Sequence, residues 1–384
     1  MPPSLLRLSI LASIAAGLLG PHVARAQVPA PTPAAIAEYR AKLAQYEDAR
    51  APYERVASAY WDQVAEKRRL RNAKRRNHIP IAIDDYVLVQ PPLYTGPPRP
   101  VDPERPTAPP PEHPPIPVVS DFLKAARSEF GFVPDRPKNE GEFKRAYARA
   151  ALNAGLTREQ VIGVYAFETG GNGTYDMQAG VTPKRTRAIS PAVGYNQLLS
   201  TNTVSLLAEY GNRYLAALRM KAVTLRGEPR RLINRKTEAL KRMIAYSRSV
   251  PNRWSEHDRL AKTTIGGWGV HAAVLDIDIG PMLQVQKLVD SVQFARMKGF
   301  GAPLTATELE LMNLTGDGNG FDMVTMPAAL RERVPTANFF QRRGYERNPV
   351  ARRTGVVANL FADIEAKMAR GARSAGAKDM AMAF

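Results

Sequence analysis

Thirteen prolines between residues 91 and 117 constrain this chain more than any other feature of its sequence. Proline lacks a backbone N–H and has a fixed φ, so neither a helix nor a strand propagates through a segment of that density. We therefore expect residues 79–118 to be an extended, semi-rigid, proline-rich linker. It separates a basic helical segment, residues 27–78, from a C-terminal part. There, residues 119–348 would form the main domain, and residues 349–384 a C-terminal helix and a flexible tail.

Residues 1–26 are typical of a cleavable signal peptide. Arg7 lies in a short n-region, residues 8–20 form an apolar run, and Ala24-Arg25-Ala26 is a small-x-small cleavage site. A run of about thirteen apolar residues is too short to span a bilayer comfortably. The sequence thus predicts an exported protein, periplasmic or secreted, with an uncleaved N-terminal anchor as the alternative.

The chain is strongly basic, with 54 lysine and arginine residues against 36 aspartate and glutamate residues and a formal net charge of +18. Such a field favours anionic partners, and export argues against nucleic acid as that partner. Seven cations gather within residues 67–76, which is typical of a segment that binds an anionic envelope surface. A solvated helix end is the alternative. The sequence leaves the oligomeric state open.

No disulfide, thiolate metal site or cysteine nucleophile is expected, because the chain has no cysteine. The five histidines are scattered without ligand spacing. Residues 317–322 carry aspartates and glycines but lack the full spacing of a calcium loop. We therefore predict neither a metal nor a cofactor.

Residues 33–77 should be helical, with tyrosines and aliphatic side chains on a heptad-like spacing. Pro52 should break or kink a continuous helix, so we expect two helices joined near Ala51, with Pro52 in the first turn of the second. A docking or self-association helix and a hairpin packed on its own domain are both compatible with this pattern.

The part after the linker is predicted to be mainly α. Strand signals are poor, and only the loop over residues 172–189 has room for a small β-hairpin. The tail, rich in Ala, Gly, Met and Lys, is expected to be frayed or disordered. Helical apolar spacing or good helix formers mark residues 122–127, 141–153, 157–168, 203–219, 231–248, 282–297 and 355–370.

One of these helices delivers an acid, Glu168, to the edge of a glycine-rich loop. Thr157 and Gln160 form a capping-box signature, and Glu168 continues the face of Val161 and Tyr165 before glycines end the helix. Apolar neighbours would desolvate the carboxyl group and raise its pKa, which is what a general acid needs. A solvated glutamate at a helix end is the alternative.

The sequence around this acid resembles the lytic transglycosylase catalytic domain of the lysozyme-like superfamily. Glu168-Thr169 stands for the family's E-S pair, and residues 194–199 (GYNQLL) stand for its G-L-M-Q-L-M motif. A third motif, A-Y-N-x-G, is matched by Asn313, with Met312 where the family has tyrosine. The resemblance spans roughly residues 122–345.

The resemblance implies a lysozyme-like helical domain with an insertion near residues 205–270. It implies cleavage of the bond between N-acetylmuramic acid and N-acetylglucosamine in peptidoglycan, with a 1,6-anhydro product. Glu168 would be both acid and base. Gln197 and Asn313 would hold the sugar or its N-acetyl arm, and Tyr195 would be a wall for a sugar ring.

Each residue that the resemblance assigns to sugar binding has a structural role as its alternative. Gln197 would cap a helix, Asn313 would close a turn, and Tyr195 would be part of the core. Two other functions stay open. One is a hydrolytic muramidase, in which Asp176 or another acid completes a pair of carboxylates. The other is a catalytically weak envelope scaffold that binds peptidoglycan or a secretion assembly.

Overall fold

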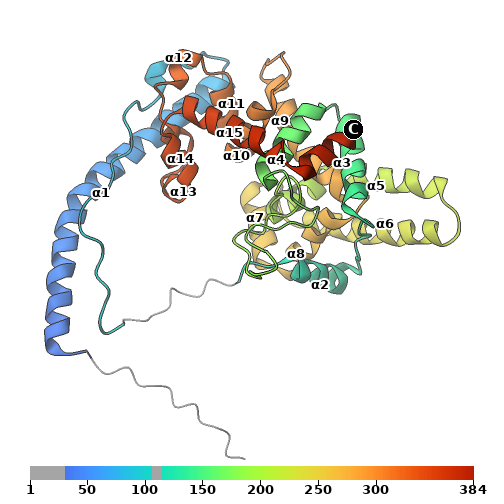
Figure 1. Ribbon diagram of the computed structural model, residues 1–384, viewed down its shortest axis with the longest axis horizontal. Coiled ribbons are helices and arrows are strands. Elements are labelled where there is room, and N and C mark those ends of the chain that lie inside the picture. The colour runs from blue at the N-terminus through green and yellow to red at the C-terminus, as the bar shows by residue number, and fades with distance from the viewer. Residues whose placement is uncertain (1–30, 106–114) are drawn as a thin grey trace, which may run out of the picture. The chain divides into compact units, whose positions relative to one another are not determined.

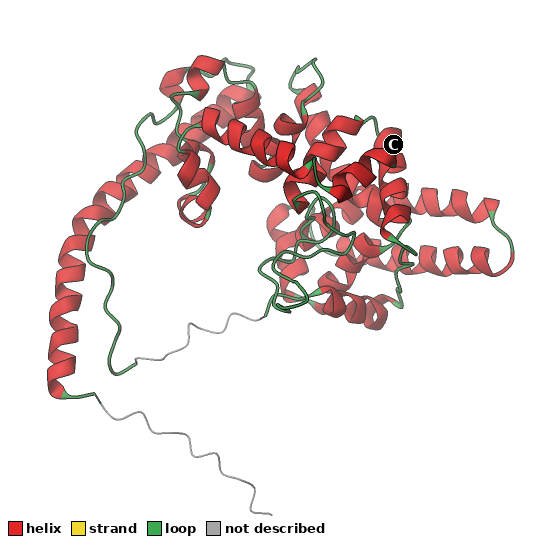
Figure 2. Cartoon of the chain, in the orientation of Figure 1, coloured by secondary structure: helices red, strands yellow, loops and turns green. Residues whose placement is uncertain are grey.

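The computed structural model describes residues 31–105 and 115–384. The predicted signal peptide lies outside the described residues, as do residues 106–114 of the predicted linker. The described chain is mainly helical, as predicted, and contains isolated β-bridges but no strand (Figure 2). In the loop expected to hold a hairpin, residues 172–189, one bridge joins Thr182 to Arg185, and another joins Gln178 to Val193 just beyond the loop.

The helices of the described residues are α1 (Pro33–Arg76), α2 (Val119–Phe130), α3 (Glu140–Asn153), α4 (Arg158–Thr169), α5 (Ser200–Thr224), α6 (Gly227–Ser247), α7 (Trp254–Thr263), α8 (Ile265–His271), α9 (Gly280–Met297), α10 (Ala306–Thr315), α11 (Asp317–Val324), α12 (Ala328–Arg331), α13 (Arg342–Arg347), α14 (Pro349–Thr354), α15 (Val357–Gly371) and α16 (Ala375–Met382). Three short 3₁₀ helices accompany them, η1 (Ile83–Asp85), η2 (Ala272–Leu275) and η3 (Thr336–Phe339).

The chain divides into two compact units, and the division falls within α1. The first unit comprises residues 1–51 and 95–109, of which the structure describes the beginning of α1 and the non-helical residues 95–105. The second unit comprises residues 52–94 and 110–384. The second unit therefore contains most of the residues that we had assigned to the basic helical segment and the start of the linker.

The prediction of two helices joined near Ala51 was wrong, because α1 continues through Pro52. Proline at this position cannot donate a hydrogen bond to the carbonyl of Asp48. Ala51 and Pro52 are both exposed, so water can bind that carbonyl and the helix persists on either side.

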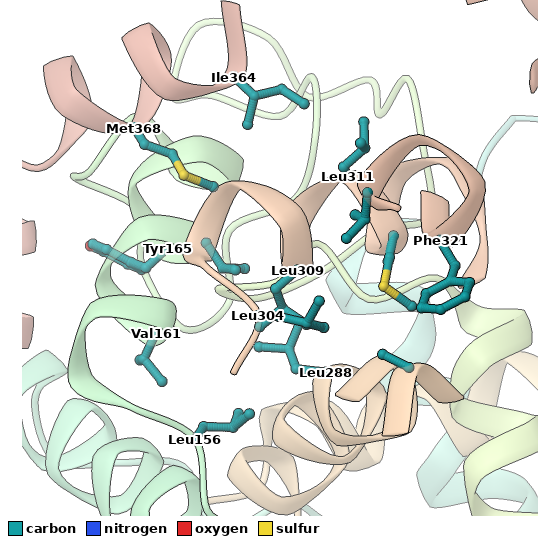
Figure 3. Packing of buried hydrophobic residues seen from close by; sticks show 14 of the residues in the cluster. Leu156, Val161, Tyr165, Leu288, Leu304, Leu309, Leu311, Phe321, Ile364 and Met368 are labelled. Atoms are coloured by element: carbon teal, nitrogen blue, oxygen red, sulfur yellow. The ribbon is translucent and has the colours of Figure 1, made fainter. Parts of the chain in front are cut away.

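A first hydrophobic core, which we call the α4 core, joins α3, α4, α9, α10, α11, α15 and α16. In Figure 3, Val161 and Tyr165 of α4 lie in one buried cluster with Leu309 of α10 and Met368 of α15. Each fully buried aliphatic or aromatic side chain contributes about 1.5–3 kcal/mol to folding. This packing fixes the position of the helix that carries Glu168.

A second core joins α2 with α5, α6, α7 and α8. The stretch predicted to be an insertion, residues 205–270, lies largely within these helices, with α5 and α6 packed side by side (Figure 1). Val193 and Leu198, from the loop after α4, are buried in the same core. Residues 205–270 are therefore an integral part of the second unit.

The last part of the chain is ordered, contrary to our expectation of a frayed or disordered tail. Residues Ala375–Met382 form α16, in which Ala377 and Met380 are buried against α3 and α4. Lys144 donates a hydrogen bond to the carbonyl of Gly376 at 2.9 Å. The sequence pattern missed this helix because it is short and its apolar residues are small or flexible.

Across the described ranges, no helix is both long and apolar enough to cross a membrane.

Candidate functional site

Glu168 lies in the last turn of α4, where the sequence placed it. The helix begins with the predicted capping box, in which the amide of Gln160 donates to Thr157 Oγ1 at 3.2 Å and the amide of Thr157 donates to Gln160 Oε1 at 2.8 Å. It ends at Gly170, which has a φ of 65°, a left-handed conformation that favours glycine. Both helix ends are thus fixed by local sequence, and Glu168 is held two residues before the turn.

Glu168 is half-buried, and its carboxyl group contacts α10. Asn313 Nδ2 donates a hydrogen bond to Glu168 Oε1 at 3.1 Å. Burial, which penalises the charged form, raises the pKa of Glu168 to about 7. The direction agrees with the expectation from the sequence. The site therefore contains a carboxyl group whose surroundings favour its neutral form.

A second acid, Glu310, lies beside Glu168 and was not among the predicted site residues. It is on α10, three residues before Asn313, so both side chains lie on the same helix face. Glu310 is fully buried, and neither of its oxygens has a hydrogen-bond partner among the described groups. Burial and the neighbouring Glu168 carboxylate raise the pKa of Glu310 well above its ordinary value.

Gln197 closes its own turn. It adopts a left-handed conformation with a φ of 42°, which is uncommon for a residue other than glycine. Its side-chain amide nitrogen, Nε2, donates to the backbone carbonyls of Gly194 at 2.9 Å and Met177 at 3.3 Å. Both donor contacts stabilise the loop between α4 and α5.

Tyr195 lies in the core, as the alternative interpretation had it. The side chain is 0% exposed, and the rings of Phe143, Tyr147 and Tyr165 pack edge-on against it at 5.0–5.3 Å between centroids. Its hydroxyl group donates to Glu140. Tyr195 therefore presents no ring face to a sugar in this structure.

Asp176, the acid considered for a muramidase, forms an ion pair with Arg136. It also accepts a hydrogen bond from the hydroxyl of Thr174 at 2.8 Å. These contacts hold the carboxylate in the loop after α4.

The other acidic clusters bind cations of the chain itself. Lys236 forms ion pairs with Asp276 and Asp278, each at 2.8 Å, and Asp322 pairs with Arg71 and Arg75. In the residues that the structure covers, no group of three or more acidic or histidine side chains is arranged to hold a metal ion.

The basic cluster of residues 67–76 is only partly free to meet a partner. Arg71 is fully buried, and its guanidinium group donates to the carbonyls of Asp85 and Asn338, each at 2.9 Å. Lys67, Arg68, Lys74 and Arg75 also bind groups of the second unit. Arg69 and Arg76 are exposed.

Compared with models of known protein families, with curated proteins and with solved structures, the chain matches none of them. The features that point to a function are therefore the short motifs of the sequence and the geometry around Glu168. In that geometry, two of the predicted residues, Glu168 and Asn313, contact each other. Gln197 and Tyr195 make their contacts elsewhere.

Proposed function

We propose that this protein is an exported peptidoglycan lytic transglycosylase with Glu168 as its acid and base. The observation that supports this function best is the Glu168 carboxyl group itself. It lies at the end of a capped helix, accepts a hydrogen bond from Asn313, and has a pKa raised by burial to about 7. Its neighbours in sequence are the residues that resemble the family's first motif.

A pKa near the operating pH suits a group that acts first as an acid and then as a base. In the proposed reaction, protonated Glu168 donates to the oxygen that bridges N-acetylmuramic acid and N-acetylglucosamine as that bond breaks. The resulting carboxylate then accepts the proton of the sugar's own 6-hydroxyl group as its oxygen bonds to the anomeric carbon. The product is a 1,6-anhydro sugar, and Glu168 regains its starting proton.

This scheme needs one carboxyl group that reaches the substrate, whereas a hydrolytic glycosidase usually needs two. Glu310 is fully buried and has no surface for a sugar or an attacking water. Asp176 is paired with Arg136. The arrangement therefore favours the transglycosylase over the muramidase.

Peptidoglycan as the substrate is consistent with the predicted signal peptide, which would place the protein in the periplasm or outside the cell. We further propose that Arg69 and Arg76, the exposed members of the basic cluster, help to hold the protein at an anionic envelope surface. No nucleic acid is expected as a partner.

The function is tested by incubating the purified protein with peptidoglycan and identifying the released fragments by mass spectrometry. We expect 1,6-anhydro ends. Glu168→Gln should reduce cleavage by roughly two to four orders of magnitude, because the amide keeps the size of the side chain but transfers no proton. Glu159→Gln, at an exposed position in the first turn of the same helix, is the matched control and should leave cleavage unchanged.

Each other result points to a different function. Reducing ends, together with an equally deep loss in Asp176→Asn, would indicate a hydrolytic muramidase. Binding to peptidoglycan without cleavage would indicate an envelope scaffold. Activity of folded Glu168→Gln within about tenfold of the parent would refute the assignment of the acid.

A further inference from the structure

Glu310 is a fully buried acid that takes no part in the proton transfers proposed for Glu168. It comes from the middle of α10, whose capping box at Thr305 and Glu308 fixes the start of the helix. The spacing of three residues directs Glu310 and Asn313 to the face of α10 that packs on α4. Asn313 contacts Glu168 directly, and Glu310 interacts with the same carboxyl group.

An ionised Glu310 would be poorly compensated, because Asn313 and Lys287 favour its charged form less than burial disfavours it. Neither of its oxygens accepts a hydrogen bond from any described N–H or hydroxyl group. Burial of a carboxylate under these conditions is costly, and a buried carboxyl group normally avoids the cost by keeping its proton. A second negative charge on Glu168 would raise the cost further.

A protonated Glu310 resolves both problems. Its O–H group becomes a donor, and the neighbouring Glu168 carboxylate is an acceptor for it. We propose that Glu310 is a positioning residue that remains a neutral carboxylic acid and donates a hydrogen bond to Glu168. This inference rests on the proposed function of Glu168 as acid and base.

In the proposed reaction Glu310 keeps its proton throughout. When Glu168 has given its proton to the bridging oxygen, the hydrogen bonds from Glu310 and Asn313 stabilise the carboxylate that is left. When Glu168 has taken the proton of the 6-hydroxyl group, the starting state returns. No proton is gained or lost by Glu310 in either step.

The inference also accounts for Met312, which is fully buried and stands where the resembled motif has a tyrosine. The phenolic hydroxyl of that tyrosine would be a donor near the acid, and methionine has none. Glu310, one turn of α10 away from Asn313, supplies a donor from a different position. A neutral Glu310 would thus donate the hydrogen bond to Glu168 that a tyrosine at position 312 could otherwise provide.

Other groups around Glu310 affect the charge of the pair. Tyr147 of α3 is fully buried, and its hydroxyl donates to Asn196 Oδ1 at 2.6 Å. The proximity of Glu310 and Glu168 contributes to the raised pKa of the Tyr147 hydroxyl, which is caused chiefly by burial. Lys287 of α9 is the neighbouring cation, and its charge lowers the pKa of Glu310 against the larger effect of burial.

The test is the pH profile of kcat/KM in the full chain with Glu310→Gln and Glu310→Met. Activity requires protonated Glu168, so it falls as pH rises through the pKa of that group. Methionine removes the donor and so destabilises the Glu168 carboxylate. The alkaline limb should therefore move upward by roughly one to two pH units, which corresponds to the free energy of a hydrogen bond to a charged group. Glutamine is neutral and keeps an N–H donor, so its limb should stay within about half a pH unit of the parent's.

Two outcomes would overturn the inference. A limb that moves clearly downward in Glu310→Gln would mean that the parent's Glu310 is ionised, because removing a neighbouring negative charge lowers the pKa of Glu168. An unmoved limb in folded Glu310→Met would mean that Glu310 donates nothing to Glu168. Glu365→Gln and Glu365→Met, at an exposed position on α15, are the matched controls and should leave the profile unchanged.

A second measurement separates this inference from the proposed function. Infrared spectra of the parent should contain a protonated-carboxyl band that persists above the pH at which Glu168 titrates and is absent from Glu310→Gln. This band needs no substrate and no catalysis. A protein that shows it without cleaving peptidoglycan would refute the function alone, and a protein that cleaves without showing it would refute the role of Glu310 alone.

Discussion

Asn313 contacts the proposed catalytic acid directly, because its side-chain amide donates to Glu168 Oε1 at 3.1 Å. The resemblance implies that Asn313 binds the sugar, whereas this contact indicates that it holds the carboxyl group of Glu168. The two roles differ in kinetics. A residue that only binds substrate affects KM, and a residue that stabilises the developing carboxylate affects kcat.

We expect Asn313→Ala to lower kcat by roughly ten- to a hundredfold with KM changed little, since a hydrogen bond to a charged group contributes about 1.5–3 kcal/mol. Steady-state kinetics on soluble glycan fragments measure the two parameters separately. Asn319→Ala, which removes a 3.3 Å hydrogen bond to the carbonyl of Thr315 on the neighbouring helix, is the control. A raised KM with an unchanged kcat would indicate that Asn313 binds the sugar instead.

Sequence reasoning located Glu168 because local signals fix it, namely a capping box before it and glycines after it. It missed Glu310 because a glutamate in a helix is ordinarily exposed. The burial of Glu310 depends on helices packed against α10, among them α4 and α15, which come from other parts of the chain. Tyr195 carries a motif position yet points into the core, since three aromatic rings surround it.

At the scale of elements, the well-predicted helices are those with their own start and stop signals. The capping boxes at Thr157 and Thr305 are present as expected. The errors were at Pro52, where the helix continues, and in α16, whose stability comes from tertiary contacts. In both cases long-range or solvent interactions decide the structure, and a local pattern contains no information about them.

The turn after α4 meets the end of α15, and two adjacent glycines test that contact. Gly170 and Gly171 both have left-handed backbones, with φ of 65° and 78°. A Cβ at Gly170 would meet nothing within 4 Å, whereas one at Gly171 would lie 2.0 Å from the carbonyl oxygen of Gly371. A substitution at either position has the cost of a left-handed backbone, but only a substitution at Gly171 also causes a steric clash.

We expect Gly170→Ala to lower the free energy of unfolding by about 1–2 kcal/mol, the cost of a left-handed alanine. Gly171→Ala should lower it by clearly more, because the end of α15 must also move. Denaturant unfolding measures both. Equal losses would show that the α15 end does not lie against this turn in solution.

At the scale of the whole molecule, the second half of α1 is part of the second unit. Tyr60 and Val64 are buried in a cluster with Val87, Ala337 and Tyr345. The ion pairs of Asp322 with Arg71 and Arg75 bury all three charges almost completely. Neither the proline pattern nor the charge run revealed these contacts, since their partners lie about 250 residues further along the chain.

Two truncated variants test where the catalytic part begins. A variant of residues 52–384 keeps every residue of the second unit and should retain the parent's melting temperature and cleavage of soluble glycan fragments. A variant of residues 118–384 removes Arg71 and Arg75 and leaves Asp322 buried without its cations. Because breaking a buried ion pair by removing one partner costs about 3–5 kcal/mol, we expect this variant to melt well below the parent.

The charge-specific part of that loss can be separated from the loss of packing. Asp322→Asn in the 118–384 background removes the orphaned charge and should recover part of the melting temperature, whereas Asp176→Asn in the same background should recover none. If the 118–384 variant had the parent's melting temperature and cleaved fragments equally well, residues 52–94 would not be part of the catalytic domain. The original division at the proline-rich linker would then describe the protein better than the contacts of α1 do.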